Sequence, residues 1–206
     1  MTPEIREKLV AIRHVSRELR KSSFPTRQLA LETLSQLIRS HRAIVLERNR
    51  EDIEALGPEA NSSFRDRLTL TPERLELMSD SLEKVHALAD PLGEVTEQRR
   101  LANGLLLKRV RSPLGVVFMI FEARPNVITE AFSLALKSGN ALIMRGGAES
   151  LRSSEIIYNF IHQALTQAGL PQECFWGITH PQRELSQWLM TQDQYIDVLV
   201  PRGVKA

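Results

Sequence analysis

The stretch LGVVFMIF at residues 114–121 decides the fold, because it is a continuous apolar run that follows Pro113 and ends at the polar Glu122. Such a run, rich in residues that favour strands, is typical of a strand buried on both faces of a sheet. VITEAFSLALKS at 127–138 follows as a helix that ends at Gly139, where glycine commonly terminates helices. ALIM at 141–144 then predicts a second strand.

The same alternation continues toward the C-terminus. Residues 150–168 predict a helix that ends at Gly169 and Pro171, and FWGI at 175–178 predicts a third strand. A short helix over 185–190 and a fourth strand, IDVLV at 196–200, follow. Strands and helices that alternate at this pace favour a parallel sheet with right-handed crossovers. We therefore predict a Rossmann-like α/β domain.

Upstream of residue 110 the pattern is helical instead. Apolar residues recur there at spacings of three and four, as on one face of an amphipathic helix. The three sets are Leu9, Ile12, Val15 and Leu19; Leu31, Leu34, Leu37 and Ile38; and Leu75, Met78, Leu82 and Val85. Thr71 and Pro72 are suited to the N-cap and first position of the third helix. GPEANSSFRD at 57–66 has no period, so we expect a surface loop.

Two extended stretches around Asn103-Gly104 predict a β-hairpin over residues 94–111. Asn-Gly favours a type I′ turn. An isolated two-stranded ribbon is marginal in water. The hairpin is therefore expected either to fold onto its own domain or to add to a partner's sheet, and the pattern alone leaves both open.

Composition excludes several classes of function. The 206 residues include 27 basic and 25 acidic side chains, too even a balance for a nucleic-acid-binding protein. No apolar run approaches the roughly 20 residues that a membrane span needs. The N-terminus lacks the apolar core of a secretory signal, so we expect a cytoplasmic protein. Only Cys174 is present, and the five histidines lack metal-ligand spacing, so neither an internal disulfide nor a metal site is expected.

Candidate binding residues lie in the loops that follow the strands, because ligands of open parallel sheets collect at the carboxyl ends of strands. These loops are residues 122–126, 145–147, 179–181 and 201–203. In the second, two glycines let the backbone approach a ligand, and Arg145 offers a fork for phosphate. A tight turn with a solvated arginine is the alternative. The G-x-G-x-x-G fingerprint is absent, so any dinucleotide is held differently.

Three segments carry a resemblance to a known family. They are DRLTLTPERLELMSDSLEKVHALADPLGEV at 66–95, NGLLLKRVRSPLGVV at 103–117 and FEARPNVITEAFSLALKSGNALIMRGGAES at 121–150. The chain resembles the gamma-glutamyl phosphate reductases of the aldehyde dehydrogenase superfamily. The resemblance implies NADPH-dependent reduction of gamma-glutamyl phosphate to glutamate-5-semialdehyde, with release of phosphate, in proline biosynthesis. It also implies N-terminal helices over 1–92, an oligomerisation hairpin over 93–112, a homo-oligomer built through it, and an NADPH-binding domain over 113–206.

The resemblance also implies roles for individual residues. Asn126 matches the superfamily asparagine whose amide holds a developing oxyanion, although a turn or cap role is open to the same residue. Arg145 matches a basic residue at the adenosine ribose, where it suits the additional phosphate of NADPH. The remaining expected cofactor residues are Pro125, Gly146, Gly147, Thr179 and Arg183.

The family's nucleophile is a cysteine in a later, catalytic domain, and we expect that this chain ends before reaching it. Cys174 starts a predicted buried strand and matches no family motif, so we expect a packed, inert thiol. The chain alone is therefore predicted to be inactive. The alternative is a non-catalytic fragment that binds NADPH or pairs with an intact reductase.

Overall fold

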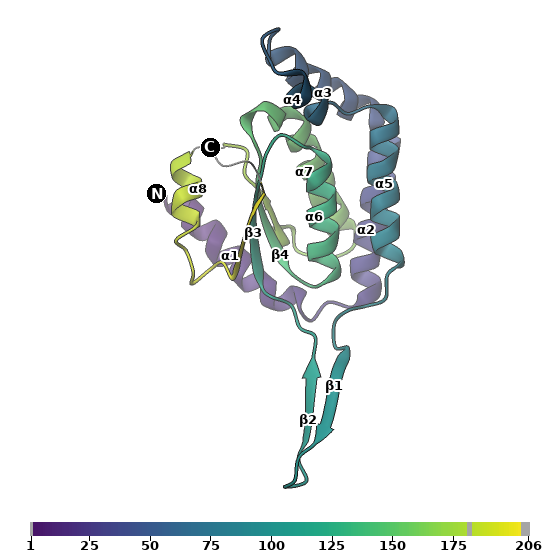
Figure 1. The fold of residues 1–206 in the computed structure, drawn as a ribbon, viewed down its shortest axis with the longest axis vertical. Helices are drawn as coiled ribbons and strands as arrows, with labels where there is room; N and C mark the ends of the chain where they lie inside the picture. The colour runs from purple at the N-terminus through teal and green to yellow at the C-terminus, as the bar shows by residue number, and fades with distance from the viewer. Residues whose placement is uncertain (1, 181–182, 203–206) are drawn as a thin grey trace.

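Four parallel strands form the central sheet in the part of the chain that the computed structural model describes, residues 2–180 and 183–202 (Figure 1). Their spatial order is β5-β4-β3-β6. The strands are β3 (Val116–Phe121), β4 (Ala141–Arg145), β5 (Phe175–Gly177) and β6 (Val198–Arg202). β3 lies between β4 and β6, with Val116 beside Ala141 and Val117 beside Val198. The predicted Rossmann-like parallel sheet is confirmed.

Helices cover both faces of this sheet. One face packs against α6 (Asn126–Lys137) and α7 (Leu151–Gln167), and the other packs against α1 (Pro3–Leu19) and α8 (Arg183–Leu189). Strand β3 contributes side chains to both faces of the sheet, because alternate side chains of a strand point to opposite faces. Phe118 packs among α1 and α8 residues, whereas Met119 packs among α6 and α7 residues. The expectation that β3 is buried on both faces is thus confirmed.

The N-terminal half supplies a second layer of helices over α6 and α7. These helices are α2 (Phe24–Ser40), α3 (Arg42–Ala55), α4 (Ser62–Leu68) and α5 (Pro72–Ala87). The predicted cap of α5 is confirmed, because Thr71 Oγ1 accepts a hydrogen bond from the backbone N–H of Arg74. Residues of α2, α5, α6 and α7 share one apolar core. This packing fixes α5 beside α6, and Lys137 at the end of α6 donates to His86 O near the end of α5.

The surface loop predicted over residues 57–66 is partly wrong. Helix α4 begins at Ser62, inside that segment, and the Asn61 side chain caps it by accepting from the Ser63 N–H. Helix α3 was not predicted either. Its buried positions include only one apolar residue, Val45, beside the polar Asn49 and Asp52. A helix whose buried side is largely polar has no apolar stripe for periodicity to detect.

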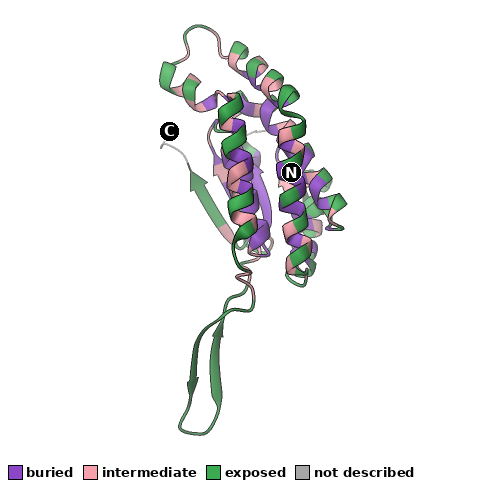
Figure 2. Cartoon of the chain, turned by 90° about the vertical axis from the view of Figure 1, so that its right-hand side faces the viewer, coloured by how far each residue is buried: buried purple, intermediate pink, exposed green. Residues whose placement is uncertain are grey.

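The hairpin of β1 (Val95–Arg100) and β2 (Leu106–Val110) projects away from the body of the molecule (Figure 2). Every residue of both strands is exposed. The alternative in which the hairpin folds onto its own domain is therefore wrong.

The turn of the hairpin also differs from the expected type I′ form. That form needs a positive φ at both central residues. Among the described residues only glycines have positive φ, so Asn103 does not qualify, whereas Gly104 has a φ of 88°. Gly104 N–H donates to Leu101 O, and Leu101 N–H donates to Leu105 O. This is the three-residue loop that combines a turn with a glycine bulge.

No helix in the described parts of the chain combines the length and the apolar character that crossing a bilayer requires.

Candidate functional site

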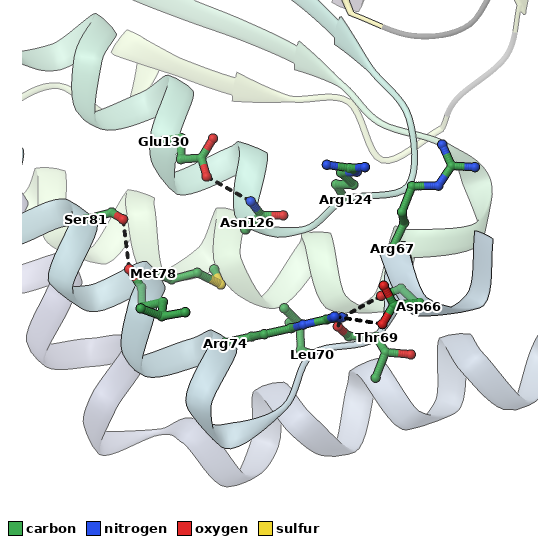
Figure 3. Close-up of a pocket in the computed structure, with 11 residues that line it drawn as sticks. Asp66, Arg67, Thr69, Leu70, Arg74, Met78, Ser81, Arg124, Asn126 and Glu130 are labelled. Carbon is green, nitrogen blue, oxygen red and sulfur yellow. Dashed lines mark hydrogen bonds and ion pairs between the residues drawn. The ribbon is translucent and has the colours of Figure 1, made fainter. Parts of the chain in front are cut away.

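Hollows open at or beside the carboxyl ends of the strands in the described part of the chain, and two of them, whose linings share no residue, contain expected site residues. We call them the α5–α6 hollow and the α8 hollow. The α5–α6 hollow has a volume of about 340 Å³ and is lined by Asp66, Arg67, Thr69, Leu70, Arg74, Leu77, Met78, Ser81, Arg124, Asn126 and Glu130 (Figure 3). The α8 hollow is lined by Ile120, Arg145, Arg183, Ser186, Gln187 and Met190. The structure therefore separates Asn126 from Arg145.

Asn126 begins helix α6 and is half-buried at the wall of the α5–α6 hollow. Its Nδ2 donates to Glu130 Oε1 at 2.8 Å, one helical turn later (Figure 3). Glu130 in turn pairs with Arg202 of β6 at 3.8 Å. A primary amide carries two N–H groups, so the bond to Glu130 occupies one of them. Glu130 thereby fixes the orientation of the Asn126 amide.

Three guanidinium groups line the same hollow. Arg74 donates to Asp66 Oδ1 at 2.7 Å and to Thr69 O at 2.7 Å. Arg67 forms an ion pair of 3.4 Å with Glu122. Arg124 is exposed, and its guanidinium makes no hydrogen bond or ion pair among the described residues. The wall of the hollow therefore carries one uncompensated positive charge at Arg124.

A buried polar cluster supports the floor of this hollow, and sequence reasoning missed it. Asn49, 2% exposed, donates through Nδ2 to Leu68 O at 2.9 Å and to Ser153 Oγ at 3.1 Å. Its Oδ1 accepts from the Leu70 N–H at 2.7 Å. Asn49 thus ties α3 to α7 and fixes the segment that brings Thr69 and Leu70 to the hollow. No local signal marks it, because Asn49 sits inside a polar helix.

The α8 hollow brings together two of the expected cofactor residues. Arg145 ends β4 and is half-buried, and Arg183 begins α8 and is exposed. The two arginines thus line one hollow, and the paired N–H donors of a guanidinium group match the oxygens of a phosphate. Thr179 follows β5 at the same edge of the sheet and does not line this hollow. Pro181 and Gly203, the ends of two loops singled out above, lie outside the described residues.

Gly146 has a packing reason for its identity. A Cβ built on Gly146 would lie 2.8 Å from Cζ of the Phe121 ring, so a side chain there would displace the ring. At Gly147 the Cβ would lie 2.5 Å from the flexible Glu149 carboxylate, which can move aside, and in ordinary contact with Ala123. Pro125 is buried and occupies the N-cap position of α6. Of the two glycines, Gly146 is needed for close packing, and Gly147 lies nearer the surface.

Cys174 has neither the exposure nor the acidity of a nucleophile. It is 2% exposed, and burial raises the pKa of its thiol to about 12. The expected packed thiol is confirmed by this burial, and its low reactivity, which follows because a thiol reacts only as its thiolate, stays a prediction. Within the described ranges, no three His, Cys, Asp or Glu side chains gather in a way that could hold a metal ion.

The chain is similar to proteins of one family over nearly its whole length. The profile of the aldehyde dehydrogenase family matches residues 3–200. A gamma-glutamyl phosphate reductase of Rhodopseudomonas palustris (strain BisB5) is 46% identical over 179 residues, which cover 86% of this chain and 42% of that protein. The Gluconobacter oxydans protein of the same name is 41% identical over 194 residues, which cover 94% of this chain and 45% of that protein. The chain thus spans less than half the length of these relatives.

Solved structures of related proteins share the fold of this chain. The gamma-glutamyl phosphate reductase of Thermotoga maritima superposes with a TM-score of 0.91 at 34% identity, covering 96% of this chain and 48% of that one. The Saccharomyces cerevisiae enzyme of the same name gives a TM-score of 0.89 at 30% identity, covering 97% and 51%. An acetylating aldehyde dehydrogenase of Geobacillus thermoglucosidasius, at 16% identity and a TM-score of 0.71, shares the fold.

Proposed function

Because the chain belongs to the aldehyde dehydrogenase family, we propose that it provides the cofactor-binding part of a gamma-glutamyl phosphate reductase. The reaction would be the NADPH-dependent reduction of gamma-glutamyl phosphate to glutamate-5-semialdehyde, with release of phosphate, on the route to proline. One observation carries this proposal: an amide donor, Asn126, and a pair of arginines, Arg145 and Arg183, lie in separate hollows at the carboxyl edge of the sheet. The relatives named above support the choice of substrate.

The residues of the α8 hollow fit the phosphorylated end of NADPH. Arg145 and Arg183 offer two guanidinium groups, which match the planar, paired acceptors of a phosphate. Pro125, Gly146, Gly147 and Thr179 would shape the rest of the groove. NADPH supplies hydride to the acyl carbon when it is bound. The residues of this chain hold the cofactor and set its distance from the substrate.

Asn126 would act at the substrate carbonyl. When a tetrahedral species forms there, negative charge develops on the carbonyl oxygen, and a preorganised N–H donor stabilises that charge. Glu130 accepts one N–H of the Asn126 amide at 2.8 Å and so holds the amide in place. The nucleophile must come from another part of the enzyme, because Cys174 is buried with a raised pKa. We propose that the chain alone gives no turnover.

The exposed hairpin supports a second candidate function, pairing with another polypeptide. β1 and β2 together present exposed apolar side chains that include Val95, Leu106, Leu107 and Val110, each 46–48% exposed. A two-stranded ribbon with free edges is suited to strand addition. We propose that residues 93–112 mediate self-association or pairing with an intact reductase, while residues 1–92 and 113–206 form the body that binds the cofactor.

A titration of nucleotide against the purified chain tests the cofactor proposal. We expect saturable binding of NADPH, and Arg145→Gln should weaken it by about 10- to 100-fold, because a charge-assisted hydrogen bond contributes about 1.5–3 kcal/mol. NADH, which lacks the additional phosphate, should lose less than about threefold. Arg6→Gln, at an exposed arginine of α1, is the control. Absence of saturable NADPH binding refutes the proposal, as does an equal loss for both nucleotides.

An assay in the oxidative direction tests the predicted inactivity. The purified chain, given glutamate-5-semialdehyde, phosphate and NADP⁺, should produce no NADPH above background. Cys174→Ser serves as the check on any activity that does appear. Turnover that Cys174→Ser abolishes would contradict the inert role assigned to this thiol.

A further inference from the structure

Arg124 is the residue of the α5–α6 hollow that the proposed function leaves without a role. It lies in the turn between β3 and α6, at the carboxyl end of the central strand β3, and its side chain lines the hollow (Figure 3). Its backbone is held in place, since Arg124 O accepts from the Val127 N–H at 3.1 Å. Its guanidinium is exposed and engages none of the described residues. An anchored backbone with an unengaged cationic side chain is suited to a ligand.

Within the described ranges, Arg124 is the one cation of the α5–α6 hollow that no carboxylate pairs with. Asp66 is engaged by Arg74 at 2.7 Å, and Glu122 is engaged by Arg67 at 3.4 Å. The third nearby carboxylate, Glu130, accepts from Asn126 at 2.8 Å and pairs with Arg202 at 3.8 Å.

Helix α6 adds to the same positive field. Its first turn carries no acidic residue, so its N-terminal partial charge is not offset there. An anion that enters the hollow therefore meets an uncompensated guanidinium.

The position of Arg124 relative to Asn126 indicates which anionic group it meets. Both residues belong to one turn and line one hollow. If the Asn126 amide lies at the reacting carbonyl, the nearest anion is the phosphate, which a single oxygen joins to that carbon. The carboxylate at the other end of a glutamyl group is separated from it by three further carbons. Arginine also matches phosphate oxygens with paired N–H donors.

We propose that Arg124 binds the phosphate group of the acyl-phosphate substrate. The same contact holds inorganic phosphate after the carbon–oxygen bond breaks and the phosphate leaves with the bonding electrons. The inference rests on the proposed function for the place of the reacting carbonyl. It adds a phosphate subsite in the α5–α6 hollow, separate from the cofactor phosphate at Arg145.

Inorganic phosphate is the probe that tests this subsite. Line broadening in ³¹P NMR during a titration of the purified chain should show saturable binding. Arg124→Gln should weaken that binding by at least tenfold, and Arg124→Lys should retain part of it, because lysine keeps the charge and loses the paired donors. Arg6→Gln is the matched control and should bind as the unaltered chain does. Arg124 is exposed, so equal urea midpoints are expected for all four proteins.

A second probe separates this subsite from the cofactor site. Adenosine 2′,5′-bisphosphate carries the phosphate pattern of NADPH, so Arg145→Gln should weaken its binding while Arg124→Gln leaves it unchanged. If Arg124→Gln binds inorganic phosphate as tightly as the unaltered chain, or loses the bisphosphate instead, the inference is overturned. If phosphate binding depends on Arg124 while NADPH does not bind, the subsite stands and the proposed cofactor function fails.

Discussion

Replacing Asn49 with alanine tests how the floor of the α5–α6 hollow is held. The Asn49 side chain makes three hydrogen bonds, two of them to backbone groups where α4 ends: it donates to Leu68 O at 2.9 Å and accepts from the Leu70 N–H at 2.7 Å. Leu68 is fully buried and Leu70 is 8% exposed. Alanine leaves one backbone acceptor and one backbone donor without partners, in a place that solvent reaches poorly.

The expected loss of stability follows from those two backbone groups. A buried donor or acceptor left unpaired costs about 1–3 kcal/mol, so two of them cost about 4 kcal/mol together. The lost bond to Ser153 Oγ, 3.1 Å long, adds about 1 kcal/mol. We therefore expect Asn49→Ala to lower the free energy of unfolding by about 4–5 kcal/mol. Asn49→Asp should also destabilise, because a carboxylate oxygen would then face Leu68 O.

Urea unfolding followed by circular dichroism measures this loss, with the midpoint shifting and the slope unchanged. Arg50→Ala is the matched control, because Arg50 is the next residue of α3, exposed, and paired with the exposed Glu54 at 3.6 Å. That pair should contribute less than about 1 kcal/mol. A loss below about 1 kcal/mol for Asn49→Ala, or a loss equal to that of the control, would show that the network does not hold the segment.

Three further predictions concern single residues. Cys174, whose pKa burial raises to about 12, should react with iodoacetamide at pH 8 at least about 100 times more slowly in the native chain than in urea, and equal rates would contradict its burial. Gly177→Ala should destabilise by about 1–3 kcal/mol in urea unfolding, because its Cβ would overlap the Tyr158 ring; an unchanged midpoint would refute the close packing. Burial lowers the pKa of His162 below its usual value, so below pH 6.5 the unfolded chain binds the proton more readily and stability falls on acidification. The loss of stability between pH 7 and pH 5 should therefore be smaller in His162→Gln, and an identical pH dependence would rule out this coupling.

Much of the fold could be predicted from the sequence because its signals are local. The apolar run at residues 114–121 indicates by its composition alone that the strand is buried. The glycines at 139 and 169, each with a φ of 72°, end the helices that precede them. The prediction failed at α3, where Asn49 and Asp52 take buried positions that periodicity assigns to apolar residues. It also failed in the hairpin turn, since Asn103-Gly104 is compatible with more than one loop length.

The candidate site was predicted less completely than the fold. The sequence, through its resemblance to a family, pointed to Asn126, Arg145 and Arg183. The structure brings Arg145 and Arg183 to one hollow and places Asn126 at another. No sequence pattern distinguishes Arg124 from the other arginines of the chain. Arg124 is distinguished by the lack of an ion-pair partner among the described residues. That property depends on where folding places the carboxylates around it.

The sequence by itself determined the alternation of strands and helices beyond residue 113, the parallel sheet and the family, because these rest on patterns within short segments. Only the tertiary structure decided which charges are compensated. Arg67 is paired with Glu122, and Arg39 with Glu76, Asp80 and Glu83, at sequence separations of 37 to 55. Electrostatic pairing depends on distance in space, and folding brings together side chains that the sequence keeps far apart.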